Sequence, residues 1–196
     1  LLPETDPIRL TYQQKCKDGL TALATANGPV DTDAHNSGIR LYVLSIGFDL
    51  CFDTLADAAP VPSDRQAIID EILTYLNPSN QSWWDWRSRL NPPYTSNGST
   101  LVGSTQGLGS IVLRGETTNT VTLDSALDFG HRIVEANLNS IFDNDGGANE
   151  GELYGSFAMR FLVPYAEARQ RYDGLDLSAR PEMQNYVRWL AYVVLP

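Results

Sequence analysis

Basic residues are scarce in this sequence: 14 Lys and Arg stand against 24 Asp and Glu, which gives a formal net charge of −10. Such a chain is a poor ligand for a phosphate backbone, so we expect no nucleic-acid partner. The charge also disfavours a polyanionic ligand, unless the binding site is locally basic. Long apolar runs are missing too. Asp49 interrupts the best candidate, and we expect no membrane-spanning helix.

Residues that bind metals or carry nucleophilic catalysis are equally sparse. The two histidines, His35 and His131, lie far apart and no cysteine spacing suggests zinc, so His131 is expected to be structural. A stretch that begins like a calcium loop has Ala148 at its sixth position and Tyr154 at its twelfth, which breaks the EF-hand pattern. Nucleophile elbows, P-loops and dinucleotide fingerprints are absent. We therefore predict no metal and no cofactor.

The chain has only two cysteines, Cys16 and Cys51. They could form a disulfide in an oxidising compartment if their helices are neighbours, but two buried free thiols are the favoured interpretation. The sequence opens with Leu1-Leu2-Pro3, without a Met and without a signal peptide. We expect either a mature form or a piece of a larger protein.

At 196 residues the chain is most simply one domain, and its patterns predict helices with no convincing strand. The expected helices span Thr11 to Thr25, Ile39 to Leu55, Ala67 to Leu76, Leu101 to Arg114, a segment capped by Thr122 and reaching Ile141, Gly151 to Tyr172 with a kink at Pro164, and Pro181 to Val194. Seven helices with short connections suggest antiparallel helical hairpins packed side by side.

The helix from Ile39 to Leu55 is apolar on almost every side, so it is expected to lie inside the architecture. Asp49 within it would need a hydrogen-bonding partner if it were buried.

Two irregular segments are the candidates for chemistry. The first, around SWWDWRSR, carries Trp83, Trp84 and Trp86, whose rings could stack on sugars, and Arg87, which could pair with a carboxylate. The alternative is that the tryptophans fill the core, and we expect at least one to do so. The second segment, DNDGGANEGELYGSFAM, joins a polar glycine-rich loop to a helix. It supplies Glu150 and Tyr154, the latter in the first turns of the helix, where a substrate could reach it.

The order of these pieces resembles the α/α-toroid polysaccharide lyases, the group of chondroitin AC, hyaluronate, alginate and heparinase II/III-type lyases. GFDLCFDTLADAAPVPSDRQAIIDEIL is similar to their Asp-containing inner helix followed by a capped outer helix. NQSWWDW resembles their Asn-Trp-Trp-Asp-aromatic stretch, and the run from DNDGG to the end of the chain resembles the heparinase-like segment. The likeness covers roughly residues 40 to 196.

The resemblance implies an all-α, incomplete α/α toroid from a secreted or periplasmic protein that cleaves a uronic-acid polysaccharide by β-elimination. It implies that Tyr154 moves the proton and that Asn97, from the loop before the fourth helix, neutralises the uronate carboxylate. Strict spacing would instead put Ser99 in that role. Trp83, Trp84, Trp86, Arg87 and Glu150 would bind the sugar.

The sequence departs from this family in two respects. No His follows Tyr154, and the β-sandwich domain that relatives usually carry after the toroid is not part of this chain, so we expect an excised toroid fragment. A second interpretation is a non-catalytic helical domain that holds a glycan or contacts a partner domain. A third is a glycoside hydrolase, which needs two facing carboxylates; Glu150, Glu152 and Asp85 are the candidates.

Overall fold

The computed structural model describes residues 6–26, 34–55, 64–77 and 95–194, and within these ranges the protein is all-α. The α-helices are α1 (Pro7–Thr25), α2 (Ala34–Cys51), α3 (Asp64–Leu76), α5 (Asn97–Val112), α6 (Thr120–Leu138), α7 (Glu152–Asp173) and α8 (Pro181–Val194). Short 3-10 helices occupy Phe52–Thr54 and Leu177–Ala179. The predicted all-helical class is confirmed. None of the helices in the described ranges is long and apolar enough to cross a membrane.

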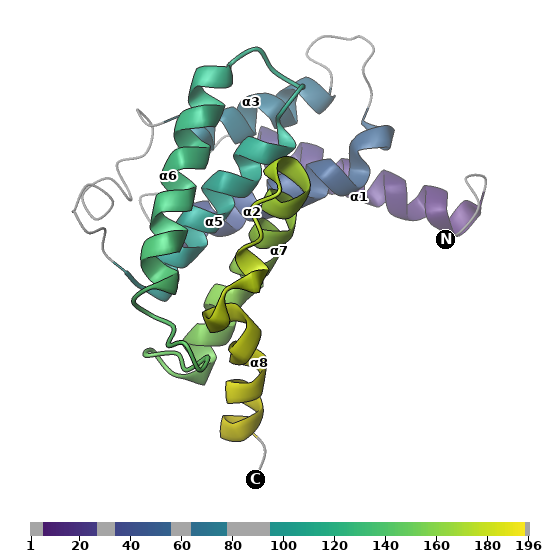
Figure 1. Ribbon diagram of the computed structural model, residues 1–196. Helices are drawn as coiled ribbons and strands as arrows, with labels where there is room; N and C mark the ends of the chain where they lie inside the picture. Colours follow the sequence, from purple (N-terminus) through teal and green to yellow (C-terminus); the bar gives the residue numbers. More distant parts are fainter. Residues whose placement is uncertain (1–5, 27–33, 56–63, 78–94, 195–196) are drawn as a thin grey trace.

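Helix α5 is the centre of the molecule, with α2, α3, α6 and α7 arranged around it (Figure 1). Its residues from Thr100 to Ser110 are all buried. Small residues make this possible, because a Cβ at Gly103 would lie 2.8 Å from Ile133, and one at Gly130 of α6 would lie 2.4 Å from the Gly103 carbonyl oxygen. The glycines let the backbones of α5 and α6 approach closely.

The expectation that Ile39–Leu55 forms the innermost helix is therefore wrong. Helix α2 begins earlier, at Ala34, and buries one face while the other meets solvent: Val43 is 45% exposed and Leu50 is 77% exposed. Asp49 lies on the exposed side, so it needs no buried partner. The small residues of α5 allow closer packing than the bulky residues of α2, and this decides which helix is enclosed.

Local signals set the helix ends, but α1, α2, α3 and α5 each begin three to five residues earlier than predicted. Asp6 caps α1 by accepting from the Ile8 N–H at 2.8 Å, and Pro7 follows at the first helical position. Gly174, in the left-handed region with φ +80°, ends α7. One predicted cap is wrong: Asn119 caps α6 and accepts from the Thr122 N–H, so Thr122 belongs to the first turn.

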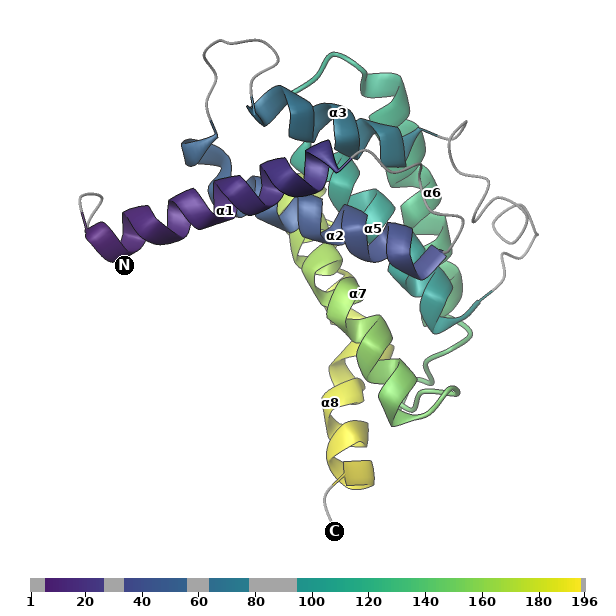
Figure 2. The ribbon, with the colours of Figure 1, turned by 180° about the vertical axis from the view of Figure 1, so that it is seen from behind.

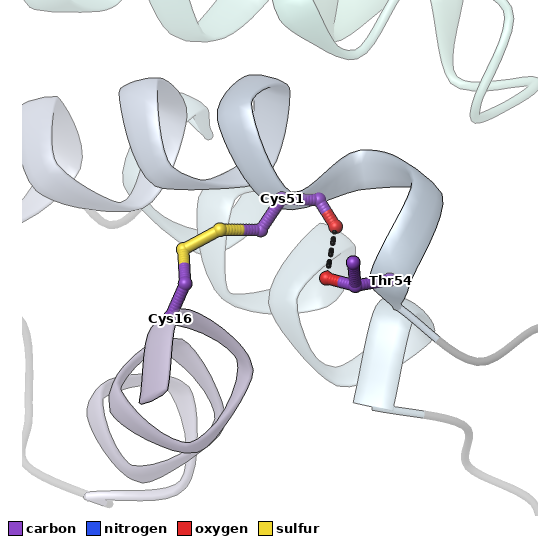
Figure 3. The surroundings of a disulfide bond; sticks show 3 residues. All are labelled: Cys16, Cys51 and Thr54. Atoms are coloured by element: carbon purple, nitrogen blue, oxygen red, sulfur yellow. Dashed lines mark hydrogen bonds between the residues drawn. A yellow bond between two sulfur atoms is a disulfide. The ribbon is translucent and has the colours of Figure 1, made fainter. Parts of the chain in front are cut away.

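Cys16 of α1 and Cys51 at the end of α2 form a disulfide, with their Cα atoms 6.4 Å apart (Figure 3). The favoured expectation of two free thiols was wrong, because α1 crosses α2 closely enough to bring the sulfurs together. Helix α1 buries only Leu20 and Ala24, and its N-terminal half extends away from the rest of the described chain (Figures 1 and 2). The disulfide therefore adds a covalent link to a helix that also contacts α2 and α3, for example through the Lys17–Asp64 ion pair at 2.9 Å.

Candidate functional site

The N-terminus of α5 is held by a hydrogen-bonded cap. Ser96 accepts from the Ser99 N–H at 3.1 Å, while the Ser96 N–H donates to the Ser99 hydroxyl at 2.7 Å. Asn137 of α6 supports both residues, since its side-chain oxygen lies 3.0 Å from the Ser96 nitrogen and 3.1 Å from the Ser99 hydroxyl. Ser99 is thus occupied by the cap, which favours Asn97 as the ligand-facing residue of the two.

Asn97 is the first residue of α5. The prediction that it lies in the loop before this helix was therefore wrong. Its side-chain oxygen accepts the Gly98 N–H at 2.6 Å. The NH2 group of the amide is then the part of the side chain that can donate to a ligand. A neutral donor at a helix N-terminus is well suited to bind an anion, because the first N–H groups and the helix dipole favour negative charge there.

The loop between α6 and α7 is built to hold Glu150. The Asp143 N–H donates to the Gly147 carbonyl and the Asn149 N–H to the Ile141 carbonyl, each at 2.8 Å. Gly146 has φ +93°, and a Cβ there would lie 2.3 Å from the Asn185 backbone of α8. The glycine-rich composition of this loop is therefore required by its close contact with α8.

Glu150 and Asn97 meet in the structure. The Asn97 N–H donates to the Glu150 carboxylate at 2.7 Å, across a long separation in sequence. Two residues that the sequence assigned to one site, from different segments, are thus in direct contact. The Glu150 carboxylate lies at the positive end of α5, where the helix dipole favours negative charge.

Tyr154 is the third residue of α7 and is 53% exposed. The next residue, Gly155, is buried, and a Cβ there would lie 2.7 Å from the Cβ of Ala148 in the loop. The first turn of α7 therefore packs against the loop segment that carries Glu150, while Tyr154 is exposed to solvent. The expectation that a substrate can reach Tyr154 agrees with this exposure.

His35, in the first turn of α2, lies beside the start of α5, and the sequence analysis did not assign it to the site. A Cβ at Gly98 would lie 3.3 Å from the His35 ring, so the imidazole covers the glycine at the start of α5. The centroid of the His35 ring lies 6.0 Å from that of the Phe157 ring. Phe157 is in α7, one helical turn after Tyr154. Figure 2 shows the first turns of α2 and α5 at the same end of the molecule. No local sequence motif marks His35, so only its tertiary contacts with Gly98 and Phe157 reveal it.

The remaining substrate-binding candidates are not among the residues that the structure describes. Trp83, Trp84, Trp86 and Arg87 lie outside the described residues, as does Asp85. Glu150 and Glu152 are both exposed and are separated by one residue at the start of α7. They share one segment and cannot form opposite walls of a groove, so they do not make the facing pair that a glycoside hydrolase needs.

A second cluster of charged groups lies between α6 and α7 and is structural. Buried Arg169 donates to the Tyr165 hydroxyl at 2.9 Å and to Asp173 at 2.8 Å. Burial raises the pKa of Tyr165. The pKa of His131 is lowered, mainly by burial and to a smaller extent by the positive charge of Arg169. A positive His131 would repel Arg169, so the neutral imidazole is favoured in the fold.

The described cavities lie away from Asn97. One of about 440 Å³ runs between α2, α5 and α7, with Leu108, Ile111 and Pro164 in its lining. Another of about 220 Å³ lies beside His131 and Arg169. In the part of the chain that the structure describes, no group of three or more His, Cys, Asp or Glu could hold a metal ion.

These features define an all-α domain in which a polar, solvent-facing cluster gathers where α2, α5 and α7 begin. No protein-family model matches the chain, and a search of curated proteins finds no significant match.

Proposed function

We propose that this domain is part of an α/α-toroid polysaccharide lyase that cleaves a uronic-acid polysaccharide by β-elimination. The observation that supports this most is the contact between Asn97 and Glu150, with His35 against Gly98 and exposed Tyr154 one helical turn before Phe157, the ring neighbour of His35. These groups come from separate segments and include an amide donor, an imidazole and a phenol. They are the groups that the chemistry of proton removal beside a carboxylate requires.

The carboxylate of the sugar would bind at the start of α5. Removal of the proton on the carbon next to a carboxylate places negative charge on that carboxylate, so fixed donors there lower the barrier. The Asn97 NH2 group and the helix N-terminus are such donors. The Glu150 carboxylate accepts the Asn97 N–H, and this preference for negative charge at the start of α5 supports the assignment.

Tyr154 would move the proton. As the phenolate it takes the proton from the carbon that carries the carboxylate, the electrons of that bond form a carbon–carbon double bond, and the bond to the glycosidic oxygen breaks. The phenol then returns the proton to the leaving oxygen, which balances the reaction and regenerates the phenolate. His35 lies close enough to Gly98 to assist in neutralising the bound carboxylate.

The tryptophan segment would extend the sugar-binding surface. Trp83, Trp84 and Trp86 would stack on sugar rings, and Arg87 would pair with a further carboxylate. Retention on a column of immobilised acidic polysaccharide is expected to fall in Trp84→Ala. Unchanged retention of a folded variant would remove this segment from the site.

The compartment follows from the same proposal. We infer a secreted or periplasmic location, because a substrate of this kind is extracellular, and the Cys16–Cys51 disulfide is typical of oxidising compartments.

The lyase proposal is tested by incubating the protein with alginate, hyaluronan, chondroitin and heparin separately. Cleavage by β-elimination produces an unsaturated uronate that absorbs ultraviolet light. Tyr154→Phe keeps the ring and removes the hydroxyl, and kcat/KM is expected to fall about 10²–10⁴-fold, the usual contribution of a general acid or base. Tyr172→Phe is the matched control, because Tyr172 is also exposed and lies at the other end of the same helix.

A second candidate function has one observation in its favour. The Glu150 carboxylate already occupies the start of α5, and the chain carries a net charge of −10. Both features fit a non-catalytic helical domain that holds a less acidic glycan or contacts a partner domain. Glu150→Gln separates the two: a lyase should bind acidic oligosaccharides more tightly when this charge is removed, whereas affinity for a neutral glycan should not change. Binding without any absorbance change in all four substrates would favour the second function.

A further inference from the structure

Asn97 is followed by Gly98, and the two are placed for a reaction with each other. The Gly98 nitrogen lies 2.6 Å from the Asn97 side-chain oxygen. Since that oxygen is bonded to the amide carbon, the carbon that the nitrogen would attack is within contact distance. We propose that Asn97 is a site of spontaneous deamidation, which converts the amide of the candidate site into an acid.

The reaction is balanced as follows. The Gly98 nitrogen loses its proton to hydroxide and attacks the side-chain carbon of Asn97, forming a carbon–nitrogen bond. The side-chain nitrogen takes a proton from water, which regenerates hydroxide, and leaves as ammonia as its bond to carbon breaks; a five-membered succinimide remains. Water then opens the ring at either carbonyl, which gives aspartate or isoaspartate at position 97. No reactant other than water and hydroxide is needed.

The position in the fold favours attack by the Gly98 nitrogen. Gly98 is the second residue of α5, and the first N–H groups of a helix have no acceptor within the helix, so no backbone hydrogen bond must break. Terminal turns also open more readily than helix interiors. Gly98 lacks a side chain that would obstruct ring closure. Asn119 provides a contrast, since it also precedes a helix but is followed by the β-branched Thr120.

The product changes the electrostatics of the site. A new carboxylate at position 97 would lie beside the Glu150 carboxylate, which already accepts the Asn97 N–H. The NH2 donor would be lost at the same time. Where this inference extends to activity it rests on the proposed lyase function, because a like charge would then repel the uronate carboxylate.

The test uses the complete chain, made in a host without N-glycosylation because Asn97-Gly98-Ser99 is also an acceptor sequence for glycans. Folded protein is aged at mildly alkaline and mildly acidic pH, and the tryptic peptide that follows Arg89 is analysed by mass spectrometry. We expect Asn97 to convert to a mixture of aspartate and isoaspartate, faster at alkaline pH. In water enriched in heavy oxygen, one solvent oxygen should be incorporated. Asn119 should convert much more slowly.

Gly98→Ala is the decisive variant. The added Cβ would lie 3.3 Å from the His35 ring, a contact that a small side-chain shift relieves, so the fold should persist. Conversion at Asn97 is expected to slow several-fold or more. Conversion at the wild-type rate in this variant, or conversion at Asn97 no faster than at Asn119 in wild type, would overturn the proposal.

The two proposals fail in different ways. The mass change does not depend on activity, so an absence of lyase activity in fresh protein refutes the lyase and leaves the modification site intact. If fresh protein is active, its activity should decline in parallel with the intact Asn97 fraction, and enzymatic repair of isoaspartate should slow that decline.

Discussion

Removal of the Cys16–Cys51 disulfide should release α1 from the rest of the domain. The two cysteines are separated by 35 residues, and chain-entropy arguments give a stabilisation of about 4 kcal/mol for a loop of that length. Packing alone offers less, because α1 fully buries only Leu20 and Ala24, and burial of a leucine side chain contributes roughly 1.5–3 kcal/mol. The disulfide is therefore a large contribution to holding α1, beside its packing, the Lys17–Asp64 ion pair and the hydrogen bonds from Arg40 to the Leu23 and Ala26 carbonyls.

Hydrogen exchange measures this effect locally. On reduction, or in a Cys16→Ala/Cys51→Ala double variant, protection of the α1 amides should fall by about two to three orders of magnitude. The amides of α5 should keep most of their protection, since that helix is buried by four neighbours. Alkylation of unreduced protein should label neither cysteine. Labelling of both, or α1 protection that does not change on reduction, would refute the reasoning.

The remaining predictions concern packing and pH. Gly107→Ala places a Cβ 2.2 Å from the buried Tyr165 ring and should lower the free energy of unfolding, measured in urea, by about 1–3 kcal/mol. Gly19→Ala is the control: its Cβ would meet nothing within 4 Å, so it should be neutral or slightly stabilising. His131 has a pKa below its ordinary value of 6.5 in the fold, so the unfolded chain takes up its proton first. Stability should thus fall as pH drops from 6.5 towards the lower, folded-state pKa. His131→Gln should flatten this part of the unfolding profile; an unchanged slope would contradict the assignment.

The sequence by itself determined that the chain forms helices and where several of them end, whereas α1, α2, α3 and α5 begin earlier than their patterns indicated. Asp6 and Pro7 start α1, Gly174 ends α7 and Pro181 starts α8, because each acts through its own side chain or backbone preference within one turn. Such local effects can be read without knowledge of the fold. The assignment of Asn97, Glu150 and Tyr154 to one candidate site also came from the sequence, through the order of its segments.

Only the tertiary structure decided which helix is enclosed. Apolar content pointed to α2, but α5 is buried because its glycines and serines permit close approach of neighbouring backbones. The Cys16–Cys51 pairing and the placement of His35 over Gly98 likewise depend on how distant helices cross. Local preferences act over a few residues, whereas these contacts are fixed by the packing of the whole domain.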